Sequence, residues 1–363
     1  MTSLFQVQIK DGKKKSAPVQ LEEKRARSFV LSAVQRLIDA GDKRVIVFKA
    51  STGIGKSTML LHELFLNNPQ RLVICSQVTI INAMSIAQYV GTLNGMELGV
   101  NVGYTTSQGR VDIAGPGIVY QTIKTTTSAF LAPMLFDNKG FPNAILVIDE
   151  AHTNQIQMQE QLAYVHSIVK NVPDALKPFI IIQSASIDEN AFAEYFDTDF
   201  IVDLQGSRQP VTELTLSSFG DLSAARSIGQ ATAECVRRIL NYKEVPVLAN
   251  AVAETRVDPA GSILVFVPSQ SMITRIEQDL RIDNCPLPIL CLSGASIEKD
   301  PRLKDQALSR EQKVIIATNV IETGFTIDGL SFVIDTLKCM TVYYNPVTKA
   351  RTFRSIAIDS SMH

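Results

Sequence analysis

One stretch near the start of the chain limits the possible folds more than any other. Residues 44–58 read Arg-Val-Ile-Val-Phe-Lys-Ala-Ser-Thr-Gly-Ile-Gly-Lys-Ser-Thr. The run begins with β-branched and apolar residues typical of a buried strand and breaks at Gly53 and Gly55, and residues 59–65 then have the character of a helix. A strand, a glycine turn and a helix joined by Gly-Lys-Ser form the layout of a phosphate-binding loop.

The residue types in this loop suit a nucleoside triphosphate. Glycines let successive backbone N–H groups surround a phosphate at a helix N-terminus, where the helix dipole favours an anion. Lys56 is expected to contact the β- and γ-phosphates and the Ser57 hydroxyl to bind Mg²⁺. Ala50 stands where the usual G-x-x-x-x-G-K-[ST] pattern has its first glycine, so the loop must accommodate a Cβ atom. A glycine-containing turn with a surface lysine is the alternative. The predicted nucleotide-binding residues are Thr52, Gly53, Ile54, Gly55, Lys56, Ser57 and Thr58.

Composition narrows the protein class. The chain has 363 residues, of which 45% are hydrophobic and 20% charged, which suits about two α/β domains and excludes a disordered chain. The formal net charge is −1, so nucleic acid must be bound by a local groove rather than by a basic surface. The five cysteines form no C-x-x-C pair, and no secretory signal or membrane-spanning apolar run is present. We therefore expect an intracellular, cytoplasmic protein without a membrane partner.

Apolar strand-like runs alternate with helical patterns in two parts of the chain, which predicts two α/β lobes with doubly wound parallel sheets. The expected division is a polar N-terminal arm (1–24), a first lobe (25–205) and a second lobe (206–363), with a site in the cleft between the lobes. Lys13–Lys15 in the arm fit either a nucleic-acid contact or, as we favour, a solvated, frayed tail. The expected strands are 44–50, 71–76, 117–120, 143–149, 178–183, 262–267, 288–292, 313–317 and 330–335.

Two adjacent acids stand at the end of the most apolar of these strands. The tetrapeptide Asp149-Glu150-Ala151-His152 comes directly after residues 143–148. An acid at this point can hold the water shell of the Mg²⁺ anchored by Ser57, and a second acid can orient and deprotonate the attacking water. We assign Asp149 to the metal and Glu150 to the general base; an acidic strand end that caps the next helix is the alternative.

With these motifs the chain resembles a DEAH-box RNA helicase of superfamily 2, from about residue 25 to the end. Asp149–His152 is similar to motif II and residues 50–58 to motif I. Residues 263–268 resemble motif IV, and residues 317–329 resemble motif V. The resemblance implies two tandem RecA-like lobes, the second of them incomplete, and a compact viral-type core or a fragment of a longer polypeptide.

The resemblance also implies roles for further residues. Lys56, Asp149, Glu150 and His152 would be catalytic, and Asp328 would lie near the nucleotide or its metal-bound water. Ser184-Ala185-Ser186 falls where the family has Ser-Ala-Thr, so the resemblance implies that Ser184 and Ser186 belong to the segment that couples hydrolysis to strand movement. The polar residues that follow the motif V strand could hydrogen-bond to the phosphates and riboses of a nucleic acid. The alternative is an ordinary polar loop whose side chains cap neighbouring backbone groups. The candidate nucleic-acid ligands are Thr79, Thr122, Lys124, Thr318 and Asn319.

Two features of the sequence depart from the family pattern, and a third has two interpretations. Val78-Thr79-Ile80 stand where the family has Pro-Arg-Arg, which removes a cationic backbone contact. The Gln-x-x-Gly-Arg-x-x-Arg motif would follow His363, so the sequence implies either further polypeptide or a form that hydrolyses poorly. The pattern of residues 342–353 predicts a hairpin. Tyr343 or Tyr344 would stack on a base of the nucleic acid, or the hairpin would be an ordinary part of the surface.

The sequence is compatible with three functions. The first is an RNA helicase core that uses ATP or another NTP with Mg²⁺ and acts on single-stranded or partly duplex RNA. The second is a hydrolysis-deficient nucleotide- and RNA-binding regulatory protein, and the third is a motor acting on DNA or protein. RNA-stimulated phosphate release separates the first two, and comparing RNA with DNA as activator separates the third.

Overall fold

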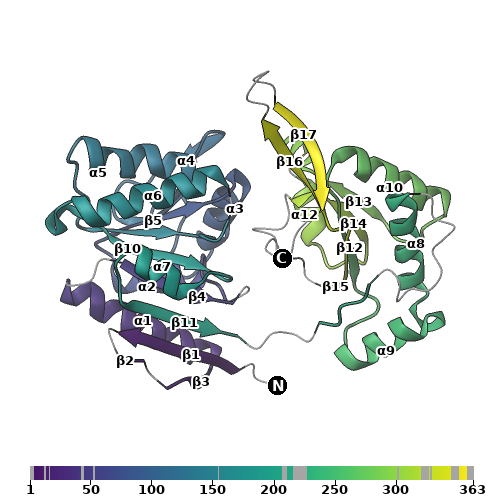
Figure 1. The fold of residues 1–363 in the computed structure, drawn as a ribbon, viewed down its shortest axis with the longest axis horizontal. Coiled ribbons are helices and arrows are strands. Elements are labelled where there is room, and N and C mark those ends of the chain that lie inside the picture. The colour runs from purple at the N-terminus through teal and green to yellow at the C-terminus, as the bar shows by residue number, and fades with distance from the viewer. Residues whose placement is uncertain are drawn as a thin grey trace. The chain divides into compact units, whose positions relative to one another are not determined.

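The computed structural model describes residues 4–11, 14–15, 17–41, 45–51, 54–153, 155–206, 211–215, 227–300, 302–319, 327, 329–344 and 351–357. The chain divides into two compact units, Met1–Arg208 and Gln209–His363, which are described separately below (Figure 1). Among the described helices, none is both long enough and apolar enough to cross a membrane.

Unit 1 is built on one large sheet with the strand order β2-β1-β11-β4-β10-β9-β5-β8-β6-β7, and β3 pairs with β1. The strands from β11 to β6 pair in parallel. Their carboxyl ends therefore lie on one edge of the sheet. The elements of unit 1 are β1 (Leu4–Asp11), β2 (Lys14–Lys15), β3 (Val19–Glu22), α1 (Glu23–Ala40), β4 (Val45–Ala50), α2 (Met59–Asn67), β5 (Leu72–Gln77), α3 (Ile80–Val90), β6 (Val102–Thr106), β7 (Gly109–Val111), β8 (Gly117–Thr122), α4 (Ile123–Thr126), η1 (Thr127–Leu131), α5 (Ala132–Phe136), β9 (Ala144–Ile148), α6 (Ile156–Asn171), η2 (Asp174–Leu176), β10 (Phe179–Ser184), α7 (Glu189–Tyr195) and β11 (Phe200–Gln205).

Two hydrophobic cores cover the two faces of this sheet. Alternate residues of each strand point to opposite faces, so Val147 on β9 packs in the core with α1, α2 and α3. Its neighbours Leu146 and Ile148 pack in the other core, with η1, α5 and α6. Figure 1 shows the sheet of unit 1 between these two groups of helices. The predicted α/β fold with a doubly wound parallel sheet is confirmed.

The N-terminal residues differ from the expected polar arm. β1 pairs antiparallel with β11, and β3 pairs antiparallel with β1, so residues 4–11 extend the sheet instead of forming a frayed tail. The reason is visible in the alternation of β1, where Val7 and Ile9 are buried while Gln6 is exposed. An alternating strand of this kind gains hydrogen bonds and one buried face by joining a sheet edge.

Unit 2 has a smaller parallel sheet in the order β13-β14-β12-β15. α8 and α10 pack together on this sheet around Val236, Ile276 and Val265. β16 and β17 form the hairpin that the sequence predicts, although the turn between them lies outside the described residues. The elements of unit 2 are α8 (Ile228–Leu240), η4 (Tyr242–Glu244), α9 (Pro246–Thr255), β12 (Ser262–Phe266), α10 (Gln270–Ile282), β13 (Ile289–Leu292), α11 (Gly294–Lys299), α12 (Arg302–Leu308), β14 (Val314–Ala317), β15 (Leu330–Asp335), β16 (Lys338–Tyr344) and β17 (Arg351–Ala357).

Candidate nucleotide-binding site

The glycine-containing loop lies at the carboxyl end of β4 and leads into α2, as the sequence predicts. Gly55 has a φ of +80°, and a Cβ atom added there would lie 3.2 Å from the Cβ of Met59, so the turn requires glycine. Ile54 is buried and anchors the loop in the core beside α2. Ala50 is fully buried at the end of β4, so the loop does accommodate its Cβ atom.

Lys56 is almost completely buried, at 5% exposure. Its amine donates to the backbone carbonyl of Ala50 at 3.1 Å and lies 3.5 Å from that of Ser51. No carboxylate within the described part of unit 1 makes an ion pair with it. A buried ammonium satisfied only by carbonyl oxygens has strong capacity for an anionic ligand.

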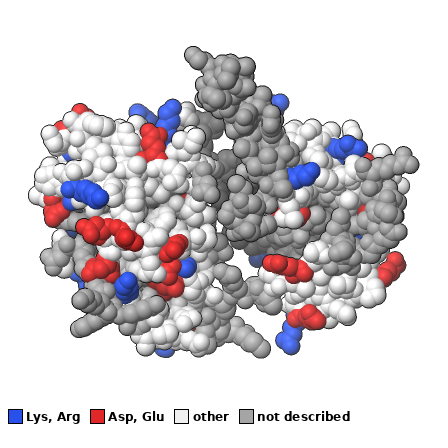
Figure 2. Space-filling view, in the orientation of Figure 1, with Lys and Arg blue, Asp and Glu red and all other residues white. Residues whose placement is uncertain are grey.

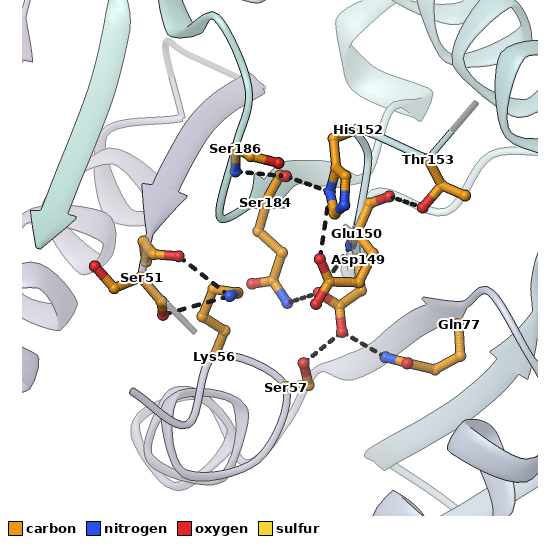
Figure 3. Close-up of polar contacts among 12 residues, drawn as sticks. Ser51, Lys56, Ser57, Gln77, Asp149, Glu150, His152, Thr153, Ser184 and Ser186 are labelled. Carbon is orange, nitrogen blue, oxygen red and sulfur yellow. Dashed lines mark hydrogen bonds and ion pairs between the residues drawn. The ribbon is translucent and has the colours of Figure 1, made fainter. Parts of the chain in front are cut away.

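Asp149 is the centre of the site, and its carboxylate is bound on both oxygens. Oδ2 accepts hydrogen bonds from the Ser57 hydroxyl and from Gln77 Nε2, the latter at 2.7 Å. Oδ1 accepts from Gln183 Nε2 at 2.9 Å and from the Glu150 backbone N–H at 3.0 Å. Figure 3 shows the Ser57 hydroxyl pointing at the Asp149 carboxylate, although the two residues are 92 positions apart in the chain.

Glu150 follows in a left-handed conformation with a φ of +51°, which is uncommon for a residue other than glycine. Its side chain is 20% exposed. Burial, and then the charge of Asp149, raise the pKa of Glu150 to about 7, while the charge of Lys56 opposes the rise. A carboxyl group with a pKa near neutrality is suited to accept a proton from water.

His152 joins this group to the end of β10. Its Nδ1 lies 2.7 Å from Ser184 Oγ and 3.4 Å from a Glu150 carboxylate oxygen. Ser184 Oγ also accepts from the Ser186 backbone N–H at 3.3 Å. Burial and the charge of Lys56 lower the pKa of His152, so the ring is mainly neutral at neutral pH. The four residues Glu150, His152, Ser184 and Ser186 thus form one connected set (Figure 3).

The donor set fits Mg²⁺ bound together with a triphosphate. Among the described residues, no cluster of three His, Cys, Asp or Glu side chains forms a complete metal site. One hydroxyl and one carboxylate, Ser57 and Asp149, already touch each other. Mg²⁺ usually takes one or two carboxylates and completes its shell with waters and substrate phosphates, so this partial set is the kind expected.

The other predicted ligands lie apart from this cluster or outside the described residues. Thr79 Oγ1 caps α3 by accepting from the Asn82 N–H at 3.1 Å. Thr122 lies 2.9 Å from the Thr125 hydroxyl, and Lys124 on α4 is exposed. Thr318 and the exposed Asn319 follow β14 in unit 2. Thr52, Gly53 and Asp328 lie outside the described residues, and the roles of all eight stay predictions.

Four residues of the site were not predicted from the sequence. Gln77 and Gln183 bind Asp149, and the Tyr120 hydroxyl donates to the Ser57 carbonyl at 2.7 Å. Ser51 Oγ donates to Gln205 Oε1 at 2.9 Å and accepts from the Gly206 N–H at 3.1 Å. The positions of Gln77 and Gln183 at strand ends, the same signal that marks Asp149, offered a way to find them.

Figure 2 shows the charged side chains on one face of each unit. On the face of each unit shown in Figure 2, Lys and Arg side chains stand among Asp, Glu and uncharged side chains, within the described part of the surface. This distribution agrees with the net charge of −1. The face shown thus offers no broad basic surface among its described residues, and a nucleic acid bound there would depend on local contacts.

Comparisons with known proteins relate both parts of the chain to one group. Residues 31–193 match the DEAD/DEAH box helicase family, and residues 245–348 match the helicase conserved C-terminal domain. The ATP-dependent RNA helicase HrpA of Borreliella burgdorferi is 24% identical over 330 residues, which cover 87% of this chain and 36% of that protein. A mouse protein named "Probable ATP-dependent RNA helicase DHX34" is 25% identical over 327 residues, covering 88% of this chain and 27% of that protein.

Solved structures of similar fold include the Escherichia coli DEAH/RHA helicase HrpB. The superposition has a TM-score of 0.70 at 21% sequence identity, and the aligned part covers 92% of this chain and 40% of the HrpB chain. The chain spans 27% of the length of the mouse relative and 36% of the length of the Borreliella relative. The relatives named here are bacterial and mammalian, and they lend no support to the expected viral-type core.

Proposed function

Because the chain carries the two domains of the DEAD/DEAH box helicases and is homologous to DEAH/RHA helicases, we propose that it is an NTP-dependent RNA helicase or translocase core. It would bind ATP or another NTP with Mg²⁺ at the loop of residues 52–58, with the second lobe closing over the nucleotide. RNA, single-stranded or partly duplex, would be the substrate. The proposal covers the segment present here, not the whole length of its relatives.

One observation carries the nucleotide part of the proposal. The Ser57 hydroxyl donates to the Asp149 carboxylate, so the end of the phosphate loop and the end of β9 meet at one point. Lys56 and Glu150 lie close enough for the charge of one to affect the pKa of the other. A single Mg²⁺-bound triphosphate would therefore contact both elements, as phosphoryl transfer to water requires.

The residues have separate proposed tasks. Ser57 and Asp149 would hold Mg²⁺, which when bound neutralises charge on the phosphates. Lys56 would leave the carbonyls of Ala50 and Ser51 and donate to the phosphates instead. Glu150 would orient a water and accept its proton.

Contacts with RNA would be made by five polar side chains, two of them in unit 2. Hydroxyl, amide and ammonium groups can all donate to a phosphate without reading a base, so we expect binding with little sequence preference. Thr79 Oγ1 accepts from the Asn82 N–H as the cap of α3, so its O–H can still donate to a phosphate. The proposed RNA ligands are Thr79, Thr122, Lys124, Thr318 and Asn319.

Phosphate release from ATP, measured with and without single-stranded RNA, tests this function. We expect RNA to stimulate release by the wild-type chain, and Glu150→Gln to abolish release while nucleotide binding persists. Glu160→Gln is the matched control, because Glu160 is exposed on α6 away from the site. A chain that binds nucleotide and RNA without hydrolysis, with Glu150 intact, would show instead a regulatory binding protein, and stimulation by DNA alone would show a DNA motor.

A further inference from the structure

Gln183 is a fully buried glutamine at the carboxyl end of β10. β10 pairs in parallel with β9, and Ile182 is the partner of Ile148, so Gln183 stands beside Asp149 one residue further along. Its Nε2 donates to Asp149 Oδ1 at 2.9 Å, and its backbone carbonyl accepts from the Ala151 N–H at 3.1 Å. Side chain and main chain of Gln183 therefore both hold the segment that begins at Asp149.

A second amide reaches Asp149 from the opposite side. β5 is the other neighbour of β9, and Ser76 is the partner of Ile148, so Gln77 also stands beside Asp149. Gln77 Nε2 donates to Asp149 Oδ2 at 2.7 Å. Each carboxylate oxygen thus accepts from one amide, and the plane of the carboxylate is fixed by the two flanking strands.

Core packing alone does not account for a glutamine at position 183. Gln183 Oε1 is buried and has no hydrogen-bond partner among the described residues. A buried acceptor without a partner costs about 1–3 kcal/mol. A methionine of similar length would fill the same space without that cost. What the glutamine provides in return is the hydrogen bond to Asp149.

We propose that Gln183 is a positioning residue that holds the Asp149 carboxylate in the orientation required for Mg²⁺. Gln183 immediately precedes Ser184, which contacts His152, so Asp149 and the segment of residues 184–186 are tied to the same strand end. The inference rests on the proposed function, because it assumes that Asp149 serves a magnesium–nucleotide complex. Residues behind a metal ligand commonly set metal affinity by fixing the ligand's direction.

The test measures binding of a fluorescent ADP analogue to the full chain while Mg²⁺ is titrated, so no catalysis is required. We expect Gln183→Met to raise the Mg²⁺ concentration at half-maximal effect about 10-fold or more. Binding in EDTA should change less than about twofold, because Gln183 acts on the metal ligand and not on the nucleotide.

Gln161→Met is the matched control. Gln161 is also fully buried, accepts from Ser76 Oγ at 3.0 Å and makes no hydrogen bond to Asp149. Gln161→Met also replaces a buried amide with a methionine side chain, so it measures any general effect of such a substitution in the core. Should Gln183→Met fail to fold, Gln183→Asn keeps an amide but is one methylene too short to reach, and the same shift is expected.

The outcomes separate the inference from the function. A wild-type chain that binds the analogue equally well with and without Mg²⁺ would overturn the proposed function and, with it, the role of Gln183. Magnesium-dependent binding by the wild type, combined with equal midpoints for Gln183→Met and Gln161→Met, would overturn the inference alone. A shift confined to the Gln183 variants supports both.

Discussion

Tyr120→Phe removes a single hydroxyl group from beneath the phosphate loop. Tyr120 lies on β8, is fully buried, and donates its hydroxyl to the Ser57 carbonyl at 2.7 Å. The ring stays in the core, so the loss is one hydrogen bond plus the cost of a carbonyl left with fewer partners, about 1–2 kcal/mol. For a folding unit of this size, each kcal/mol lowers the melting temperature by about 2–4 °C. We therefore expect unit 1 to melt about 2–8 °C lower.

The same substitution should also weaken nucleotide binding, because Tyr120 holds the backbone of the residue whose hydroxyl touches Asp149. We expect the Kd for the magnesium–ADP complex to rise about 3- to 10-fold, equivalent to about 0.6–1.4 kcal/mol. Calorimetric melting and fluorescence titration measure the two effects.

Tyr164→Phe is the control for Tyr120→Phe, because the Tyr164 ring packs edge-on against Phe136 and its hydroxyl makes no hydrogen bond in the described part of unit 1. The reasoning is refuted if Tyr120→Phe melts and binds like the wild type, or if Tyr164→Phe has equal effects.

Three further predictions concern the surroundings of the site. Lys49 donates to Glu189 at 2.8 Å; although burial raises the pKa of Glu189, this hydrogen bond and the charge of Lys49 lower it below the ordinary 4.5. The free energy of unfolding of the wild type should therefore be higher than that of Glu189→Gln above pH 5, by less than about 1 kcal/mol. Urea titrations should show this difference disappear as the pH falls toward about 3, where Glu189 becomes protonated. Ser51→Ala loses its bonds to Gln205 and Gly206 and should lower that free energy by about 0.5–1.5 kcal/mol in urea, whereas Ser32→Ala, on the exposed side of α1, should change it little. Ser184→Ala breaks the contact with His152 and should reduce strand displacement of a labelled RNA duplex about 5-fold or more beyond its effect on hydrolysis; an equal loss of both activities would contradict a coupling role.

Local patterns were enough to predict the two halves of the site but not what holds them. The loop around Lys56 and the acids at 149 and 150 each lie within one short stretch, where a strand is followed by residues with evident chemistry. Gln77 and Gln183 also stand at strand ends, but that position does not say which residue they contact, because their contact with Asp149 depends on β5 and β10 being the neighbours of β9. Strand order is set by packing of the whole sheet, which sequence spacing does not reveal.

The N-terminal strand shows the same limit. Residues 6–10 alternate between polar and apolar side chains, a pattern that predicts a strand with one buried face. Its partner β11 begins at Phe200, far along the chain. Without knowledge of that partner, the polar composition and the three lysines at 13–15 outweigh the alternation, and the sequence favours a tail.

The strand order also decides which element can influence the whole site at once. β10 lies between β4, which carries the phosphate loop, and β9, which carries Asp149, and it pairs in parallel with both. We therefore expect a shift at the end of β10 to change the distance between the loop and the acids, or to break the contacts of Gln183 with Asp149 and of Ser184 with His152. Because β10 pairs with both strands, we expect residues 183–186 to respond to a change in the nucleotide, and the Ser184→Ala experiment tests this expectation.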